Sequence, residues 1–383
     1  MPLVTVAQGT PMRILLVTTG LKMGGAEHQV VALARAFLGI GHEVAILSLS
    51  AGREIDLPAG AHVVELNMRK TPAGMARSLC QARALVRSWQ PDVIHAHMVH
   101  ANLFARALTR IVRCPPLVCT AHSFREGGRL RMLAYRATDG WSSLTTHVSN
   151  DGRSGMIAVG AVPAQRIVVM PNGIDVDRFR PDPALRVATR ERLGIDADAR
   201  LVLNVGRLAP EKAQDLLIRA FARIDASMPA HLLIAGGGAL RQPLADQVTS
   251  LGLASRITLL GPRDDVPALL NAADAFVLSS NIEGLPMVLV EALACGCPVV
   301  STDAPGVVEV LRDQGVVVAR GDADALGRAI VAVLEEGRGS PTQQAGRRER
   351  VLSTFSIDAV AQRWLRTYAS LSGTSAIVQP GAA

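Results

Sequence analysis

The chain has 383 residues, 49% of them hydrophobic and 3% aromatic, which is enough to bury the cores of two domains of ordinary size. Its net charge of +7 is unevenly placed, because 12 basic and only two acidic residues lie between Arg69 and Arg136, so the first half is expected to meet an anionic partner. That block has no RNP, zinc-finger or helix-turn-helix signature, which argues against nucleic acid, whereas an anionic membrane surface fits the charge.

Two further classes of protein are excluded. No apolar run reaches the roughly 18 residues that a membrane helix needs, because Glu291 interrupts the nearest one. Residues 1–10 lack the basic start and the apolar core of a secretory signal, and residues 1–11 are treated as an extension. The five cysteines are scattered and odd in number, with no C-x-x-C pair, so we expect reduced thiols in the cytosol rather than disulfides.

The first half alternates between strand and helix signals. The first strand opens into the glycine pair Gly24-Gly25, which would let the backbone approach a ligand closely at the turn into a helix. The pair is not part of a G-x-G-x-x-G fingerprint, so a dinucleotide fold is poorly supported, and a simple tight turn is an equal alternative. The expected strands are residues 13–18, 42–49, 62–66, 92–96, 116–120, 145–148 and 166–169, and the expected helices are about 25–38 and 73–88.

Histidines stand at the ends of two of these strands. His95 and His97 end one strand, with His100 just beyond, but no carboxylate or cysteine completes a tetrahedral set, so no metal site is expected. His97 is instead expected in the core or lining a cleft. His122 leaves the carboxyl end of the next strand, which would place it at a ligand site, unless it only caps its own loop.

The second half begins after a Pro-Asn-Gly turn at residues 171–173. Its first strand leads into Arg207 and Lys212, two cations on a loop entering a helix, which could clamp a diphosphate or could simply be solvated. The glycines at 236–238 would suit a close approach to a ligand. The expected strands are 201–205, 231–235, 257–260, 275–278, 298–302 and 316–318, and the expected helices are about 214–224, 286–295, 322–336 and 356–370, with a polar tract at 337–350.

Two carboxylates bracket the helix that follows the strand at 275–278. Glu283 precedes this helix and Glu291 lies inside it, in an otherwise apolar segment where a charge needs a partner. Carboxylates suit vicinal hydroxyls, and the backbone N–H groups from Leu285 to Val288 at the helix start could receive phosphate. Together they describe a nucleotide-sugar site, although either glutamate alone could be a solvated surface residue.

The stretch Glu283-Gly-Leu-Pro-x-Val-Leu-x-Glu291-Ala, followed by Gly-x-Pro-Val-Val at 296–300, closely resembles the signature of the family 4 retaining glycosyltransferases. The resemblance covers residues 13 to about 368 and implies the GT-B architecture, in which two facing Rossmann-like domains flank a cleft. Residues 12–172 would form the N-terminal acceptor-binding domain, 173–200 the linker, 201–350 the nucleotide-sugar-binding domain, and 356–370 a helix that crosses back to the first domain.

The resemblance also implies residue roles. Glu283 would bind hydroxyls of the donor sugar and Glu291 the ribose, while Arg207 and Lys212 would hold the pyrophosphate and His122 would contact the sugar near the reacting carbon. The remaining donor contacts would come from the glycine pair Gly24 and Gly25, from Arg263 near the base, and from Gly284, Leu285 and Pro286 beside Glu283. One departure is that the family usually has glycine after the lysine, where this chain has Ala213, whose side chain could narrow the approach of the phosphate.

The function that the resemblance implies is hexosyl transfer with retention, from a nucleoside diphosphate sugar, most readily a UDP-sugar, to a saccharide or polyprenyl-diphosphate-linked acceptor. Such a reaction would serve cell-surface polysaccharide or lipopolysaccharide synthesis at the inner face of the plasma membrane, with no cofactor and no metal. The alternatives are a sugar-nucleotide epimerase of the same architecture and a non-catalytic partner subunit. A metal-dependent transferase of another fold would need a D-x-D motif at a strand end, and the D-x-D strings at 196–198 and 322–324 fall on connectors or helix starts.

Overall fold

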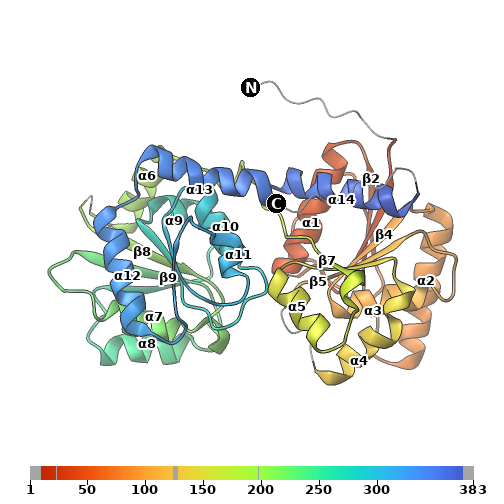
Figure 1. Ribbon diagram of the computed structural model, residues 1–383, viewed down its shortest axis with the longest axis horizontal. Coiled ribbons are helices and arrows are strands. Elements are labelled where there is room, and N and C mark those ends of the chain that lie inside the picture. Colours follow the sequence, from red (N-terminus) through yellow and green to blue (C-terminus); the bar gives the residue numbers. More distant parts are fainter. Residues whose placement is uncertain (1–9, 23, 124–127, 197, 374–383) are drawn as a thin grey trace. The chain divides into compact units, whose positions relative to one another are not determined.

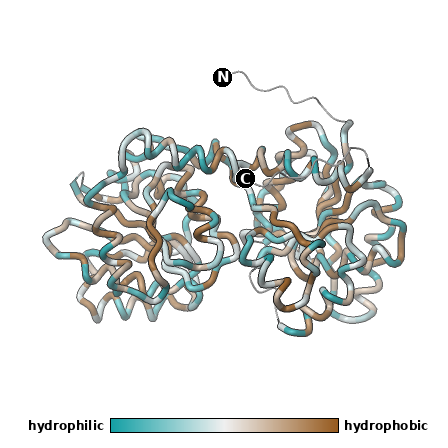
Figure 2. Tube along the Cα trace, viewed as in Figure 1, coloured by the Kyte–Doolittle hydropathy of each residue, from teal (hydrophilic) through white to brown (hydrophobic). Residues whose placement is uncertain are grey.

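The computed structural model describes residues 10–22, 24–123, 128–196 and 198–373, and the chain divides into two compact units (Figure 1). The first unit holds the chain up to Gly173 together with the segment from Ile357, and the second runs from Ile174 to Ser356. Each unit is built on one parallel sheet whose strands are apolar along most of their length, as the brown strands of Figure 2 show. Because parallel strands are covered by helices on both faces, such continuous apolar runs are the expected sequence signal.

The first sheet has seven parallel strands. Their order is β3 (His62–Glu65), β2 (Glu43–Ser48), β1 (Arg13–Thr18), β4 (Val93–His97), β5 (Leu117–Ala121), β6 (Leu144–His147) and β7 (Ile167–Val169). All seven lie within a few residues of the predicted strands, since each is a short buried run between turn signals.

Two cores lie on the two faces of this sheet. Ile14 and Leu16 of β1 pack in a core with α1 (Gly25–Gly39) and α14 (Ile357–Leu371), whereas Leu15 and Val17 pack in a second core with α2 (Pro72–Trp89) and α3 (Val99–Leu108). This division follows from the alternation of side chains along a strand. A smaller core near β7 includes residues of α4 (Arg129–Thr138) and α5 (Asn150–Ala158).

The helix expected at residues 356–370 is α14, and it belongs to the first unit (Figure 1). Four of its side chains, Val360, Ala361, Trp364 and Tyr368, are buried in the core beside α1. The chain leaves the first unit and returns to it at neighbouring points, because a Cβ at Gly173 would lie 2.8 Å from Cα of Ile357.

The second sheet has six parallel strands, and helices cover both of its faces. The strand order is β10 (Ile257–Gly261), β9 (Ala230–Ala235), β8 (Arg200–Val205), β11 (Ala275–Leu278), β12 (Val299–Thr302) and β13 (Val316–Val318). The helices are α6 (Pro183–Leu193), α7 (Gln214–Phe221), α8 (Arg241–Ser250), α9 (Val266–Ala272), α10 (Met287–Ala294), α11 (Val307–Leu311), α12 (Ala323–Glu336) and α13 (Pro341–Thr354).

The sequence showed residues 337–350 only as a polar tract and assigned no helix to it, whereas most of the tract forms part of α13. The helix starts with a capping box, in which Ser340 and Gln343 each bind the other's backbone N–H. Its arginines bind carbonyls near the end of α10, which have no partner within that helix: Arg347 donates to the Gly296 carbonyl at 3.1 Å and Arg348 to the Ala294 carbonyl at 3.0 Å. These arginines therefore hold α13 against the end of α10. The polar composition of the segment alone does not indicate this role.

The strand order reverses once in each sheet, between β1 and β4 in the first and between β8 and β11 in the second. Open parallel sheets bind ligands at the carboxyl ends of the strands on either side of such a reversal. We therefore expect a ligand site in the segments that follow these four strands.

Candidate functional site

In the second unit, the loops after β8 and β11 bring a lysine and a glutamate into direct contact. Lys212 Nζ lies 2.7 Å from Glu283 Oε1 and 2.8 Å from Oε2. Ser280 Oγ donates a third hydrogen bond to Glu283 Oε1 at 2.6 Å. The Glu283 side chain is 8% exposed and that of Lys212 is 23% exposed, so this is a largely buried charge pair. Two residues that the sequence predicted for one site thus meet, 71 positions apart in the chain.

Contacts between the two loops hold this pair in place. The Asn281 N–H donates to the Glu211 carbonyl at 2.8 Å, and Ser279 Oγ donates to the Lys212 carbonyl at 2.9 Å. From the next strand, Thr302 Oγ1 donates to the Ser280 carbonyl at 2.6 Å. The serines after β11 are buried and were not singled out in the sequence, although hydroxyl side chains at the end of an apolar strand are a usable signal.

The other two predicted cations are also paired with carboxylates. Arg207 contacts Glu211, four residues later, and its side chain is 70% exposed. Arg263 binds Asp265 through Nε at 2.7 Å and Nη2 at 2.6 Å, and this contact lowers the pKa of Asp265. Arg207, Lys212 and Arg263, the three cations predicted to meet the donor, thus each have a carboxylate partner. A phosphate group would have to displace or rearrange these partners.

Ala213, the departure from the family pattern, has a backbone in the left-handed region, with φ 47° and ψ 43°. Glycine adopts this region without cost, whereas a residue with a Cβ does so at about 1–2 kcal/mol. The position therefore favours glycine because of the turn between η3 (Pro210–Lys212) and α7. The sequence suggested that the Ala213 side chain could narrow the approach of a phosphate. The left-handed backbone gives a simpler reason why glycine is favoured at this position.

The glycines at 236–238 were expected to allow close approach of a ligand, but the structure gives two of them another reason. A Cβ at Gly236 would lie 1.9 Å from the Gly206 carbonyl oxygen, and one at Gly238 would lie 2.3 Å from that of Leu208. Both also have positive φ, of 144° and 154°. These glycines let the loop after β9 pack on the loop that carries Arg207.

The start of α10 follows the predicted pattern closely. Pro286 precedes the helix as its N-cap residue, and the Gly284 carbonyl, with Pro286, packs against Gly306, where a Cβ would lie 2.7 Å from that carbonyl. Leu285 is buried. Glu291 is half-buried one turn into the helix, and burial raises the pKa of its carboxyl to about 7. Among the described residues, no cation bonds directly to Glu291, and the charge of Arg178 offsets only part of the effect of burial on the pKa.

In the first unit, the ends of β4 and β5 place histidines together. His97 Nδ1 lies 3.0 Å from His122 Nε2, and His97 is 1% exposed, which agrees with the expected core or lining role. Burial lowers the pKa of His122 to about 3, so its ring is neutral at physiological pH. Beneath them, His95 is fully buried, with Nδ1 2.6 Å from the Tyr368 hydroxyl and Nε2 2.7 Å from Thr120 Oγ1.

The glycine pair precedes α1, and its two members differ. A Cβ at Gly24 would lie 2.2 Å from Glu27 Oε2, because the Glu27 side chain folds back over the turn. At Gly25 a Cβ would meet nothing within 4 Å among the described residues. The contact at Gly24 is with the end of a flexible side chain, which can move, so packing requires glycine at neither position.

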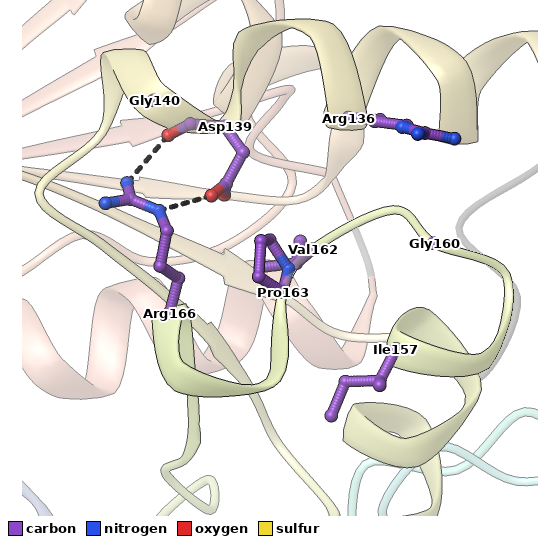
Figure 3. Close-up of a pocket in the computed structure, with 8 residues that line it drawn as sticks. All are labelled: Arg136, Asp139, Gly140, Ile157, Gly160, Val162, Pro163 and Arg166. Carbon is purple, nitrogen blue, oxygen red and sulfur yellow. Dashed lines mark hydrogen bonds and ion pairs between the residues drawn. The ribbon is translucent and has the colours of Figure 1, made fainter.

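A separate hollow lies in the first unit between α4, α5 and the turn before β7, lined by Arg136, Asp139, Gly140, Ile157, Gly160, Val162, Pro163 and Arg166 (Figure 3). Arg166 spans one side and binds both the carboxylate and the carbonyl of Asp139. Asp139 also pairs with the fully buried Arg106. The hollow contains none of the predicted site residues, and two of its polar side chains, Asp139 and Arg166, are engaged in holding the fold.

Among the described residues, no group of three or more His, Cys, Asp or Glu is placed to hold a metal ion, and no helix is long and apolar enough to cross a membrane.

Comparisons with known protein families match both units. Residues 186–350 match the model described as Glycosyl transferases group 1, and residues 23–178 match the model described as Glycosyltransferase Family 4. The chain is 33% identical over 237 residues to the GDP-mannose-dependent alpha-(1-6)-phosphatidylinositol monomannoside mannosyltransferase of Mycolicibacterium smegmatis, an alignment that covers 58% of this chain and 62% of that enzyme. The enzyme of the same description from Mycobacterium tuberculosis H37Rv is 31% identical over 270 residues, covering 66% of this chain and 69% of the enzyme.

Among solved structures, HepE of Anabaena in complex with UDP and glucose superimposes with a TM-score of 0.81 at 24% identity, covering 94% of this chain and 100% of that one. At this identity the likeness shows the fold alone. The predicted GT-B fold class, with two Rossmann-like parallel-sheet units, is confirmed.

Proposed function

Because this chain belongs to the family 4, group 1 glycosyltransferases, we propose that it moves a hexosyl residue from a nucleoside diphosphate sugar to a saccharide or polyprenyl-diphosphate-linked acceptor. The reaction would serve the synthesis of a cell-surface polysaccharide or lipopolysaccharide. The observation that carries the proposal is the contact of Lys212 with Glu283 at the carboxyl edge of the second sheet. It joins a cation suited to a diphosphate with a carboxylate suited to sugar hydroxyls. We do not propose a sugar-nucleotide epimerase, because the family consists of transferases.

We assign the donor to the second unit. Arg207 and Lys212 would hold the diphosphate, Glu283 the sugar hydroxyls and Glu291 the ribose. Arg263 would lie near the base, and the backbone from Gly284 through Leu285 and Pro286 would line the phosphate. In the first unit, the turn at Gly24 and Gly25 would face phosphate and acceptor, and His122 would act at the transferred sugar.

The proposed chemistry is retention through a short-lived ion pair. The departing phosphate would take the proton of the acceptor hydroxyl, and fixed cations at Arg207 and Lys212 would stabilise the charge that develops on it. Because these side chains supply the positive charge, transfer is expected to survive a chelator. Activity that is lost in EDTA and restored by magnesium or manganese would contradict this part of the proposal.

The donor nucleotide can be tested without knowing the acceptor. UDP is our first candidate, and GDP is the second because the mycobacterial relatives are described as GDP-mannose-dependent. A ligand at 100 times its dissociation constant stabilises the folded protein by about 2.7 kcal/mol, which corresponds to roughly 5–10 °C in the melting temperature of a unit of this size. UDP, GDP and ADP are compared at equal concentration in a thermal shift assay, and no shift with any of them would refute a nucleotide-sugar site.

We also propose that the first unit docks on an anionic membrane surface, where a lipid-linked acceptor would be found. Exposed apolar side chains follow one stripe of α4 and the turn after it, with Leu130 83%, Leu133 58% and Trp141 40% exposed. Arginines flank this stripe at Arg129, Arg131 and Arg136. Apolar side chains beside cations suit the interface of a membrane with anionic lipids.

Sedimentation with phosphatidylglycerol vesicles should capture the protein, and salt should release it because screening weakens the charge contacts. Leu130→Ser with Leu133→Ser should reduce capture further. Equal binding to neutral phosphatidylcholine vesicles, or no effect of salt, would remove the electrostatic part of this proposal.

A further inference from the structure

The two side chains of the charge pair in the second unit have different numbers of partners. The Glu283 carboxylate accepts from two side chains, because Oε1 lies 2.7 Å from Lys212 Nζ and 2.6 Å from Ser280 Oγ, while Oε2 lies 2.8 Å from Nζ. Among the described residues, the Lys212 ammonium hydrogen-bonds only to Glu283. If the lysine moves away, the glutamate therefore keeps one side-chain partner, whereas the lysine keeps none and can bind another anion.

Ser280 has little freedom to follow a moving side chain. It is fully buried, and Thr302 Oγ1 donates to its carbonyl at 2.6 Å. The residues on either side are also bonded, because Ser279 Oγ and the Asn281 N–H donate to carbonyls of the loop after β8, at 2.9 and 2.8 Å. Three consecutive residues thus have fixed backbone positions, and the Ser280 hydroxyl starts from a fixed point.

The chemistry of the contact gives the serine a defined role. An ionised carboxylate accepts hydrogen bonds and donates none, so the Ser280 hydroxyl is the donor to Glu283. A carboxylate has about four acceptor positions, so one bond to the serine leaves the others open to hydroxyl groups of a ligand. A buried carboxylate that lost every donor would be strongly destabilised. The bond from Ser280 is the side-chain contact that persists when the lysine is withdrawn.

We infer that Ser280 is a positioning residue: its Oγ–H keeps the Glu283 carboxylate in place after Lys212 has turned to the diphosphate of the donor. The part that concerns the donor rests on the proposed function. Because Ser280 is fully buried, it acts through Glu283 and has no surface of its own to offer a sugar. The contribution of the sugar to donor binding should therefore depend on Ser280, and the contribution of the diphosphate should not.

The first test needs no nucleotide. Lys212→Met removes the ammonium group but keeps most of the side-chain volume, and its crystal structure should show the Glu283 carboxylate still at hydrogen-bond distance from Ser280 Oγ. When Ser280→Ala is added, the carboxylate should turn away from this position. A carboxylate that has already left the serine in Lys212→Met would overturn the inference. So would one that stays in place in the double variant, because packing alone would then fix it.

The second test measures how much the sugar adds to donor binding. Calorimetry gives the dissociation constants of UDP and UDP-glucose, or of GDP and GDP-mannose if GDP gives the larger thermal shift. Both members of a pair would displace Lys212 from Glu283, so the cost of that step cancels in their ratio. Ser280→Ala should reduce the advantage of the nucleotide sugar over the bare diphosphate about two- to tenfold, the value of one net hydrogen bond.

Ser279→Ala is the matched control for this measurement. It removes a fully buried hydroxyl from the neighbouring residue, but that hydroxyl bonds to the Lys212 carbonyl and not to Glu283. The ratio should stay unchanged in this variant. An equal fall in both variants would show that the serines only stabilise the loop, and would overturn the inference.

The failure of this inference can be told apart from the failure of the proposed function. If the nucleotide sugar binds but its advantage is unchanged in Ser280→Ala, the donor site stands and the role of Ser280 is wrong. If no nucleotide binds at all, the proposed function is wrong, and the crystal structures of the Lys212→Met variants still decide whether Ser280 holds Glu283.

Discussion

The pairing of Lys212 with Glu283 has an unusual consequence for ligand binding. If Lys212 holds the diphosphate of the donor, it must first give up contacts of 2.7 and 2.8 Å with the glutamate. Glu283→Gln removes the charge that holds the lysine while keeping an acceptor for Ser280. We therefore expect this variant to bind bare UDP or GDP more tightly than the unaltered protein, and to transfer sugar more slowly, because the proposed hydroxyl contacts are weakened.

The size of the effect follows from burial. Charge-assisted hydrogen bonds contribute roughly 1.5–3 kcal/mol, whereas exposed ion pairs contribute only about 0.2–1 kcal/mol. With Glu283 8% and Lys212 23% exposed, we place this pair near 1.5 kcal/mol, which is about a tenfold gain in affinity for the bare diphosphate. Stability should fall by a similar amount, or about 3–6 °C in melting temperature.

The measurement is isothermal titration calorimetry with whichever nucleotide gives the larger thermal shift. Glu211→Gln is the matched control, since it frees Arg207 in the same way, but that side chain is 70% exposed and its release should change affinity by at most a few fold. Adding Lys212→Met to Glu283→Gln should abolish the gain. If Glu283→Gln binds the nucleotide no more tightly than the unaltered protein, the pair does not compete with the diphosphate and the reasoning is wrong.

Three other outcomes are expected. Ala213→Gly should raise the free energy of unfolding by about 0.5–1 kcal/mol, since relief of the left-handed strain exceeds the entropy that glycine adds; a lower melting temperature in calorimetry would contradict it. Because the pKa of Glu291 is raised to about 7, its carboxylate ionises only as pH rises through neutrality, so nucleotide affinity should increase from pH 6 to 8, and Glu291→Gln should flatten that profile. Lys212→Ala should weaken both diphosphate binding and turnover, roughly ten- to a hundredfold, whereas His122→Ala should lower turnover alone; equal loss of diphosphate binding in both would disprove the separate roles.

The strands were the most predictable part of the fold, for a physical reason. Buried parallel strands are short apolar runs between turn residues, and β1 and β11 have the bounds that the sequence gives. The polar helix α13 was missed because its arginines bind backbone carbonyls at 294 and 296, which lie far from it in sequence. A pattern of polarity does not contain that information.

The candidate site was predictable as a set of residues but not as a set of contacts. Family spacing identified Lys212 and Glu283 separately, and nothing in the sequence indicated that they would bind each other. Similarly, His97 was placed in the core or in a cleft, but its hydrogen bond to His122 depends on how β4 and β5 align. Long-range register of this kind is set by the whole sheet and not by any local run.

The two units differ in when all of their elements become available during synthesis. The second unit is one continuous segment, Ile174–Ser356, and every strand of its sheet is present once that segment has left the ribosome. The first unit contains β1, among the earliest elements to be made, and α14, the last of the described helices, whose Trp364 and Tyr368 pack in the core with β1. Domains that are contiguous can fold as they emerge, so the second unit is free to complete its fold before the first, even though it is translated later. The first unit would keep an exposed apolar face until residue 371 is released. A chain that stops near residue 356 would contain a folded second unit and an incomplete first unit.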